Sequence, residues 1–492
     1  MIRKFSAKNY KKFIETGEIP FSKITMFVGT NSSGKSSFIK SLILLSDNLM
    51  NRNQVTIKNS KSNKVFFGFN TSSCDNVNLG TFKRVVNNDT ESDLITFEAN
   101  FFEKEDNENL DLSVRVEVQN DEEISDLGYI SRVLIIDNMC GASFNFNLKN
   151  WTAEVEFPAE RYYALEHEVT YGKYTIYNSD EYTNKEEVLH FNFPIKPEAL
   201  SGELLVSLFH NIIYESLPHT MSSDTMTYGG KIEKGTINPC LVLEGYWHSI
   251  MAKIRSSRNF PDIEYIYAHA ITRKVIFSIN DKNDYVAQTI HEAYTHKTLY
   301  NKGAKDFINY WLSRFKIGTE CKISTIEGEG YIVHITDYKG HTRNLVDIGT
   351  GSAQIVLLLL KVATIMTTSI SKLIVVEEPE QNLHPNYQSL LADLFYNIQD
   401  IGVRMIIETH SEYLIRRSQV IVALLASEKG YNQKEIDENN PFRVIYFPES
   451  GKPYDMHYKV NGDFEHLFGE GFFDAAAKNR VELYKMQLDQ NR

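Results

Sequence analysis

The chain of 492 residues carries a formal net charge of −12, and 42% of its residues are hydrophobic and 24% are charged. An acidic balance of this size argues against a protein that coats nucleic acid by electrostatic attraction alone. The cysteines, Cys74, Cys140, Cys240 and Cys321, have no C-x-x-C spacing, and the first residues lack the apolar core of a signal peptide. We therefore expect a cytoplasmic protein in a reducing compartment.

The first third of the chain predicts strands around one long helix. Residues 1–50 read as strand, turn, strand, loop and helix, with an apolar run at 24–28 typical of a buried strand and helical spacing at 35–45. The polar stretch 51–62 predicts a loop. From about 64 to 160, alternating segments such as LITFEANFF and LSVRVEVQ predict antiparallel strands joined by acidic turns.

The middle of the chain changes period. Residues 186–258 have helical spacing, with a second helix expected near 241–254, and the segment IEYIYAHAITRKVIFSI returns to strand character. From about 306 onward strands and helices alternate, which predicts a parallel sheet. The longest apolar stretch, 355–370, is short for a membrane span and predicts a buried helix, so we expect no membrane association. The first helix expected within 186–258 would carry four apolar residues on one face: Leu200, Leu204, Leu208 and Ile212.

Residues 29–36 read GTNSSGKS and fit the pattern G-x-x-x-x-G-K-[ST] between a predicted strand and a predicted helix. The glycines let successive backbone N–H groups turn toward phosphates, and the helix start adds the positive end of its dipole. Lys35 would neutralise the β- and γ-phosphates of ATP, and the Ser36 hydroxyl would bind Mg²⁺. The residues expected to hold the nucleotide in this loop are Asn31, Ser32, Ser33, Gly34, Lys35, Ser36 and Ser37.

A second acidic motif follows an apolar run at 373–376, where the chain continues Glu377-Glu378-Pro379-Glu380. This is the Walker B arrangement, in which Glu377, at a position where Asp is usual, would bind Mg²⁺ and Glu378 would orient the attacking water. The other interpretation is a strand that runs into a solvated acidic turn. The motif GTNSSGKS upstream and the NLHP run at 382–385 favour the ATP site.

A histidine follows the next apolar run, at 403–407, in the segment Glu408-Thr409-His410-Ser411. A lone histidine is most often structural. Because His410 lies directly after the strand that follows Walker B, we expect it to reach a γ-phosphate.

A third glycine-containing segment, DIGTGSAQ at 347–354, leads into the apolar helix. Small residues at a helix start offer free N–H groups to an anion. The loop of Lys35 already covers one side of the nucleotide, so Gly351 and Ser352 would serve the nucleotide of a partner subunit. The alternative, equally open on local grounds, is an ordinary turn before a core helix.

These segments stand in the order of ABC-type ATPase heads, which the chain resembles over about 1–90 and 340–480. More narrowly, EEPE followed by L-H-P, with GTGSAQ in place of LSGGQ, is similar to the OLD-type ATPases of bacteria and their phage-defence relatives. The segments 79–83 (LGTFK) and 469–474 (GEGFFD) add to the resemblance, and 267–273 matches a family strand weakly. The resemblance identifies no glutamine to complete the Mg²⁺ shell.

The resemblance implies an α/β fold: an ABC-type P-loop ATPase head with a mixed sheet, interrupted by a long β-rich and then helical insertion. The expected segments are 1–160, the first part of the head; 161–305, a helical and mixed insertion; and 306–492, the second part of the head. It also implies a head-to-tail homodimer or a higher oligomer. Glu378 and His410 of one subunit would then act on a nucleotide that Gly351 and Ser352 of the other subunit contact.

OLD proteins carry a Toprim nuclease domain, whose metal site needs an Asp-x-Asp pair, and this pair occurs nowhere in the sequence. We expect residues 411–492 to be too few for such a domain. The nearest metalloprotease-like pattern, His291 and His296, has i,i+5 spacing and would not share a zinc ion.

The resemblance therefore implies an ATP-hydrolysing sensor or scaffold of anti-phage defence. It would respond to a phage-encoded trigger and control a separately encoded nuclease. This nuclease would be of Toprim type, as in PARIS-type defence, or of HNH type, as in Septu-type defence. The alternatives are a DNA-repair ATPase of the SMC or RecF kind that acts directly on DNA, and a transporter cassette. The long interval between Ser36 and Glu377 argues against the cassette.

Overall fold

The computed structural model describes 2–50, 63–70, 77–105, 108–121, 127–162, 165, 188–197, 200, 203–215, 243, 246–247, 250, 262–266, 274–281, 284–368, 372–399, 403–469 and 481. The predicted loop at 51–62, most of the helix expected at 241–254, and the segments 267–273 and 470–474 lie outside these residues. The chain divides into two compact units, Met1–Pro20 with Ser37–Pro261, and Phe21–Ser36 with Asp262–Arg492.

The first unit is built on an antiparallel sheet in the order β11-β10-β9-β8-β7-β6-β1-β2, with β3 paired to β1 and β5 to β8. Alternate residues are buried along these strands, as in β10, where Ala153, Val155 and Phe157 face the core. The prediction of antiparallel strands between 64 and 160 is confirmed. The strands are β1 (Ile2–Tyr10), β2 (Phe13–Glu15), β3 (Ile19–Pro20), β5 (Phe66–Phe67), β6 (Leu94–Glu105), β7 (Glu108–Asn120), β8 (Gly128–Asp137), β9 (Ala142–Asn147), β10 (Thr152–Pro158) and β11 (Val188–Pro194).

The prediction of helical structure is wrong for the start of the segment 186–258. Residues Val188–Pro194 form the strand β11, in which half-buried and exposed side chains alternate, and they pair antiparallel with β10. The alternation of VLHFNFP has a period of two, which suits a strand beside an existing sheet edge. The helix α4 begins later, at Leu204, and extends to Glu215, with Leu204 and Leu208 buried. Among the described residues, α2 (Phe82–Val85) and most of α1 (Lys35–Met50) also belong to this unit.

The second unit contains a six-stranded mixed sheet in the order β12-β17-β18-β4-β19-β20. Its strands run parallel except β20, which pairs antiparallel with β19. The prediction of an α/β fold with a mixed sheet is confirmed. The strands are β4 (Ile24–Gly29), β12 (Asp262–Ile266), β17 (Lys372–Glu377), β18 (Arg404–Glu408), β19 (Phe442–Phe447) and β20 (Tyr454–Asp455).

The two units do not follow the three sequence segments 1–160, 161–305 and 306–492. The reason is β4, which lies near the start of the chain but hydrogen-bonds to β18 on one side and to β19 on the other. The phosphate-loop strand therefore belongs to the unit formed by the C-terminal part of the chain.

The prediction of a parallel sheet from about 306 onward is also wrong for the first strands of that region. Strands β14 (Glu320–Ile326), β15 (Gly330–Thr336) and β16 (Thr342–Asn344) form a separate antiparallel sheet with β13 (Phe277–Ser278). Three residues join β14 to β15, with Glu327 and Gly328 at positive φ. Such a tight turn permits a hairpin, whereas parallel neighbours need a crossover of about a dozen residues or more.

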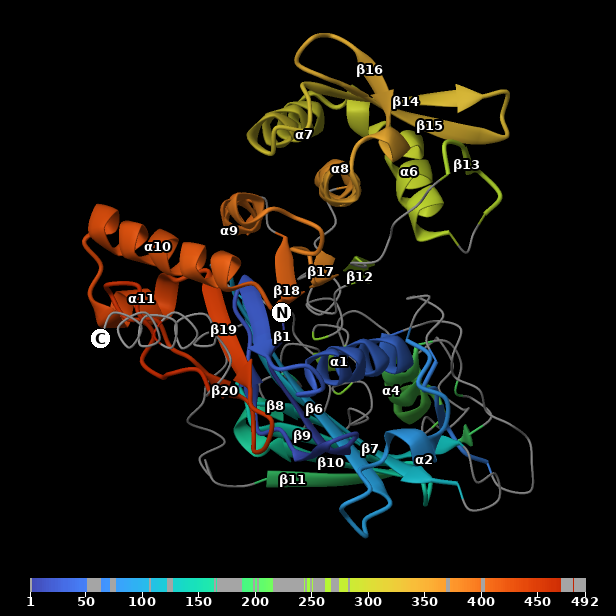
Figure 1. Cartoon of the computed structure of the whole chain (residues 1–492). Coiled ribbons are helices and arrows are strands. Elements are labelled where there is room, and N and C mark those ends of the chain that lie inside the picture. The colour runs from blue at the N-terminus through green and yellow to red at the C-terminus, as the bar shows by residue number, and fades with distance from the viewer. Residues whose placement is uncertain are drawn as a thin grey trace, which may run out of the picture. The chain divides into compact units, whose positions relative to one another are not determined.

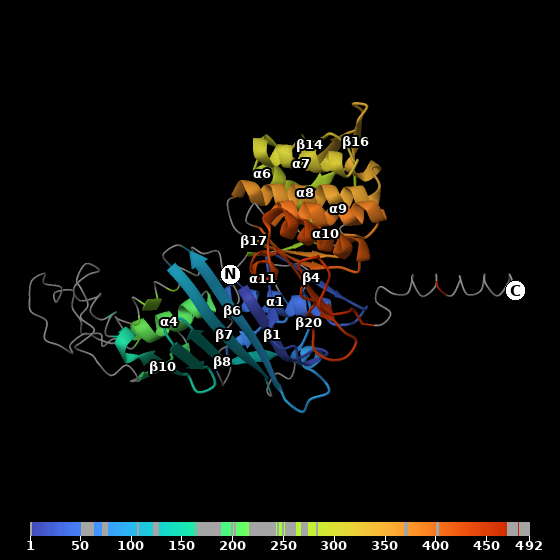
Figure 2. The ribbon, with the colours of Figure 1, turned by 90° about the vertical axis from the view of Figure 1, so that its left-hand side faces the viewer.

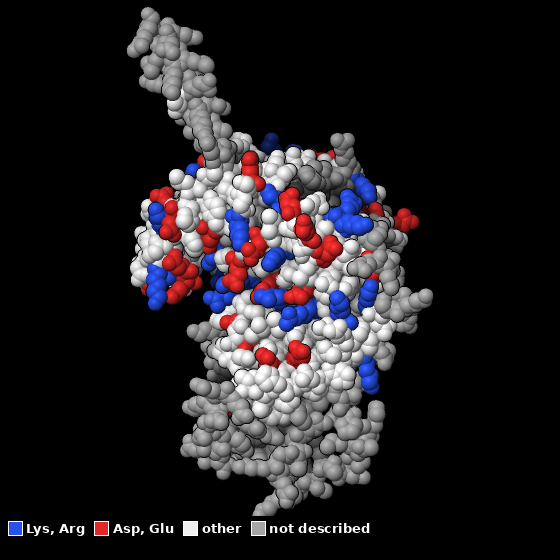
Figure 3. All heavy atoms as spheres, turned by 90° about the horizontal axis from the view of Figure 1, so that it is seen from below, with Lys and Arg blue, Asp and Glu red and all other residues white. Residues whose placement is uncertain are grey.

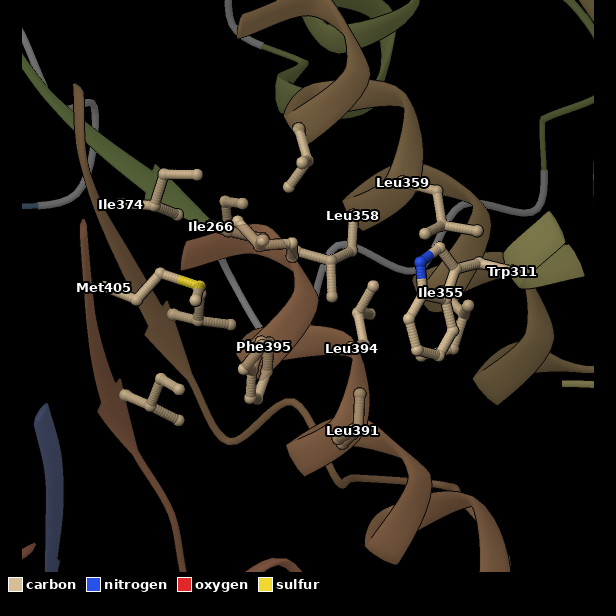
Figure 4. Packing of buried hydrophobic residues seen from close by; sticks show 14 of the residues in the cluster. Ile266, Trp311, Ile355, Leu358, Leu359, Ile374, Leu391, Leu394, Phe395 and Met405 are labelled. Atoms are coloured by element: carbon tan, nitrogen blue, oxygen red, sulfur yellow. The ribbon is translucent and has the colours of Figure 1, made fainter. Parts of the chain in front are cut away.

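Figures 1 and 2 show α8, α9 and α10 on the same side of the strands β17 and β18. The core between them contains Ile374 and Met405 from the sheet and Leu358 and Phe395 from the helices, all of them buried (Figure 4). Helix α8 confirms the predicted buried helix; its length and composition alone would allow it to cross a membrane, but 67% of its most apolar window is buried in the protein. The α-helices for which the described residues of this unit give bounds are α6 (Tyr285–Thr295), α7 (Lys302–Arg314), α8 (Thr350–Thr368), α9 (Pro385–Gln399), α10 (Glu412–Lys429) and α11 (Gln433–Asn439).

Candidate functional site

Three neighbouring parallel strands of the second unit end at one edge of the sheet. Glu377 ends β17 and is the register partner of Glu408, which ends β18, and Glu408 in turn lies opposite Phe27 of β4. Residues that follow the carboxyl ends of parallel strands meet at the same edge. This register brings the phosphate loop together with the acidic motif and the histidine segment, which both lie hundreds of positions later in the sequence.

The phosphate loop follows β4 in a conformation that its glycines permit. Gly29 and Gly34 have φ of 151° and 104°, and a Cβ on Gly29 would lie 2.3 Å from the carbonyl oxygen of Phe447, so no other residue fits there. The buried hydroxyl oxygens of Thr30 and Ser33 have no hydrogen-bond partner among the described residues. Buried polar atoms of this kind need a partner, and a phosphate-bearing ligand in the loop would supply one.

Other residues of the predicted loop lie as follows. Asn31 and Ser32 are exposed, and Ser32 has a positive φ of 62°. The Lys35 ammonium group is buried and donates to the carbonyl oxygens of Gly29 and Thr30, at 3.1 and 2.9 Å. Ser37 is a half-buried residue in the first turn of α1 and is grouped with the first unit.

Glu408 is the residue that sequence reasoning missed. Its Oε1 accepts a hydrogen bond from the Ser36 hydroxyl at 2.8 Å and lies 3.9 Å from Nζ of Lys35. Burial raises the pKa of this carboxyl group to about 7; Ser36 and Lys35 oppose the rise, whereas the charges of Glu377 and Glu378 add to it. The signal was present in the sequence, because Glu408 follows an apolar run as Glu377 does.

The donor set at this edge suits a magnesium ion. Mg²⁺ prefers hard oxygen ligands such as hydroxyl and carboxylate groups, often one or two carboxylates completed by water and phosphate. Ser36, Glu377 and Glu408 supply such oxygens, and the Oε2 atom of Glu408 is buried without a hydrogen-bond partner among the described residues. The residues present therefore fit the ion.

Glu378 and His410 face each other beside this donor set. The Nε2 atom of His410 lies 3.8 Å from Oε1 of Glu378, and each side chain is 31% exposed. Glu378 has a positive φ of 41°, a strained conformation for a residue with a side chain, and its N–H donates to the carbonyl oxygen of Glu408 at 2.7 Å. Burial and the charge of Lys35 lower the pKa of His410, and Glu378 opposes them, so a neutral imidazole is favoured.

Gly351 and Ser352 lie in the first turn of α8. Gly351 is buried, and a Cβ at this position would lie 2.4 Å from the carbonyl oxygen of Asn382 and 2.8 Å from a methyl carbon of Leu383. This glycine therefore has a packing reason within its own chain. Ser352 is half-buried. Their contact with a partner's nucleotide stays a prediction.

Comparisons with known proteins add a family to this geometry. Similar solved structures include the Smc head bound to the C-winged helix domain of ScpA, with 11% identity over 93% of this chain and 98% of that one and a TM-score of 0.40. The SMC head domain of Thermotoga maritima is 12% identical over 85% and 91%, with a TM-score of 0.33. The Smc head with an extended coiled coil bound to the ScpA C-terminal domain from Pyrococcus furiosus is 11% identical over 93% and 96%, with a TM-score of 0.35.

These likenesses are too low to carry a conclusion, and no curated protein sequence matches the chain. The family model described as AAA ATPase domain, in contrast, matches residues 1–415, which include the phosphate loop, the acidic motif and His410. On that match the chain belongs to the AAA ATPase domain family.

Proposed function

We propose that the second unit binds Mg²⁺ and ATP at the edge formed by β4, β17 and β18 and hydrolyses the nucleotide, in the manner of an ABC-type ATPase. The observation that carries the proposal is the shared environment of five residues within one unit. Contacts join Glu408 to Lys35 and Ser36, the Glu378 N–H donates to the Glu408 carbonyl oxygen, and His410 lies beside the Glu378 carboxylate. A cation, metal-binding oxygens and a carboxylate are groups that phosphoryl transfer uses, and a neutral imidazole beside them can donate a hydrogen bond to a phosphate oxygen.

Each group has a role that its position supports. The loop N–H groups and Lys35 would hold the phosphates, for which the ammonium group would leave the carbonyl oxygens it contacts now. Glu378, partly exposed at the strand end, would orient the attacking water and accept its proton, and His410 would donate to the γ-phosphate. Ser36, Glu377 and Glu408 would hold Mg²⁺, which would neutralise charge on the phosphate oxygens.

Two variants test this function in steady-state hydrolysis and in equilibrium titration with a fluorescent ATP analogue. Lys35→Ala should abolish nucleotide binding. Glu378→Gln should keep binding and lose turnover, because the amide is a poor base. Matched controls are Lys434→Ala and Glu438→Gln, whose side chains are 84% and 62% exposed on α11. A Glu378→Gln protein with full activity would remove Glu378 from its role, and wild-type protein without any hydrolysis would refute the proposal.

We further propose that two copies share each nucleotide, with Gly351 and Ser352 of one copy facing the phosphates held by the other. The start of α8 supports this, because a buried glycine and a half-buried serine in a first helical turn leave N–H groups without intrahelical partners. The dimer would then form only with ATP bound, and light scattering of the Glu378→Gln protein with and without ATP measures it.

At the level of the cell we propose a sensor or scaffold in anti-phage defence that controls a separate nuclease of Toprim or HNH type. Its support is the resemblance of the EEPE, LHP and GTGSAQ segments to phage-defence ATPases. Purification of the tagged chain with its natural neighbours should retain such a nuclease. If DNA instead stimulates hydrolysis, and added salt steeply reduces this stimulation, the alternative of a DNA-repair ATPase is favoured. On the face drawn in Figure 3, the basic and acidic side chains of the described residues are intermixed.

A further inference from the structure

The segment 409–411, which joins β18 to α10 and carries His410, is held by two side chains from the part of the chain that follows β17. The Oε1 atom of Glu380 accepts the backbone N–H of His410 at 2.6 Å. The Oε1 atom of Gln388, on α9, accepts the hydroxyl of Ser411 at 2.7 Å. The first contact fixes the residue that carries the imidazole, and the second fixes its neighbour.

Glu380 has an environment that packing alone does not explain. It is 7% exposed, and its Oε2 atom has no hydrogen-bond partner among the described residues. Burial raises the pKa of its carboxyl group, and the charge of Glu378 adds to the rise; the N–H groups of His410 and of Glu380 itself and the side chain of Thr409 oppose it. Burial of a carboxyl group costs free energy that an apolar side chain would not cost. The contacts of Glu380 with the segment 409–411, first of all with the His410 N–H, are what the structure gains from it.

The loop that carries Glu380 is itself fixed at the sheet edge formed by β4, β17 and β18. Its backbone closes two turns, from the N–H of Gln381 to the carbonyl oxygen of Glu378 and from the N–H of Leu383 to that of Glu380, both at 3.1 Å. Glu378 in turn donates its N–H to the carbonyl oxygen of Glu408. One short loop therefore presents the Glu378 carboxylate and also determines where the backbone of His410 lies.

We infer that Glu380 is a positioning residue for hydrolysis, which acts by holding the backbone of His410 so that its imidazole stays beside Glu378 at the γ-phosphate site. The inference rests on the proposed ATPase function. The start of α10 is anchored separately, because Ser411 caps it by accepting the N–H of Leu414 and is bound by Gln388. Loss of the Glu380 contact should therefore displace His410 without unfolding the helix that follows.

A double-mutant cycle on the full chain tests this dependence. In steady-state ATP hydrolysis, Glu380→Ala should lower kcat by about 10-fold to 100-fold with KM within about twofold, since misplacement by about 1 Å has effects of this size. His410→Ala should lower kcat by a similar or larger factor. In the His410→Ala background, Glu380→Ala should cause no further loss, because a positioning residue has nothing left to position.

Two more variants separate positioning from general damage. Glu380→Gln keeps an oxygen at the acceptor position and should retain kcat within about threefold of the wild type. Glu264→Gln changes another partly buried carboxylate of the same unit, 18% exposed and paired with Lys361 on α8; it should lower stability and leave kcat unchanged. If Glu380→Ala is insoluble, the cycle is run with Glu380→Asp, whose shorter side chain withdraws the acceptor.

Additive losses in the cycle would overturn the inference, and so would a Glu380→Gln protein as impaired as Glu380→Ala. Failure of the proposed function is distinguishable, because it appears as wild-type protein that does not hydrolyse ATP. An active wild type with additive losses refutes the role of Glu380 alone.

Discussion

Replacing Glu408 with glutamine should change stability and activity in opposite directions. The residue is 4% exposed, and its carboxyl group has a pKa of about 7 in the folded protein against an ordinary value of 4.5. The folded state therefore binds a proton more tightly than the unfolded state, and wild-type stability falls as pH rises from about 4.5 to about 7. Glutamine stays neutral at every pH and still offers an oxygen to the Ser36 hydroxyl, so Glu408→Gln escapes this loss.

The size of the effect follows from the two pKa values. Full ionisation of such a group costs about 3 kcal/mol of native stability. In urea unfolding of metal-free protein with a chelator present, the stability advantage of Glu408→Gln should grow by about 2 kcal/mol between about pH 5.5 and about pH 8.5. With Mg²⁺ and ATP the variant should need about tenfold more Mg²⁺ for half-maximal hydrolysis, because one oxygen donor becomes neutral.

The control for the stability experiment is Glu438→Gln on α11, whose side chain is 62% exposed and should show no advantage at any pH. A stability difference between Glu408→Gln and the wild type that does not vary with pH would refute the reasoning. It would mean that the carboxyl group keeps its ordinary pKa in the folded protein.

Other consequences follow from packing and from the proposed sharing of a nucleotide between two copies. Gly351→Ala should lower the free energy of unfolding by about 1–3 kcal/mol, because its Cβ would meet the carbonyl oxygen of Asn382 at 2.4 Å, whereas Gly349→Ala, with nothing within 4 Å, should be neutral in the same denaturant titration. Ser352→Arg should prevent the ATP-dependent dimer in light scattering while circular dichroism stays unchanged. If this variant assembles and hydrolyses ATP normally, the proposal of a shared site is wrong. Lys361→Met leaves the carboxylates of Glu264 and Glu292 without their buried cation; thermal unfolding should report a loss of about 3 kcal/mol.

Local pattern predicted much of this protein. The motif GTNSSGKS, placed between an apolar run and helical spacing, indicated β4, the loop and α1, because a phosphate cradle needs those flanks. The period of two between 64 and 160 indicated the antiparallel strands for the same kind of reason, since a half-buried strand must alternate. Prediction from periodicity failed for a short segment that fits both the helical and the strand period. In Val188–Pro194 an available sheet edge decided for a strand.

The sequence by itself indicated most of the candidate site residues and the elements on which they lie, because strand, loop and helix signals depend on near neighbours. Only the tertiary structure decided that Glu408 shares the site with Ser36, and that Glu380 holds His410. Both contacts depend on the order and register of β4, β17 and β18, which long-range hydrogen bonds fix. Residues that are hundreds of positions apart become neighbours through that pairing, and no local pattern records it.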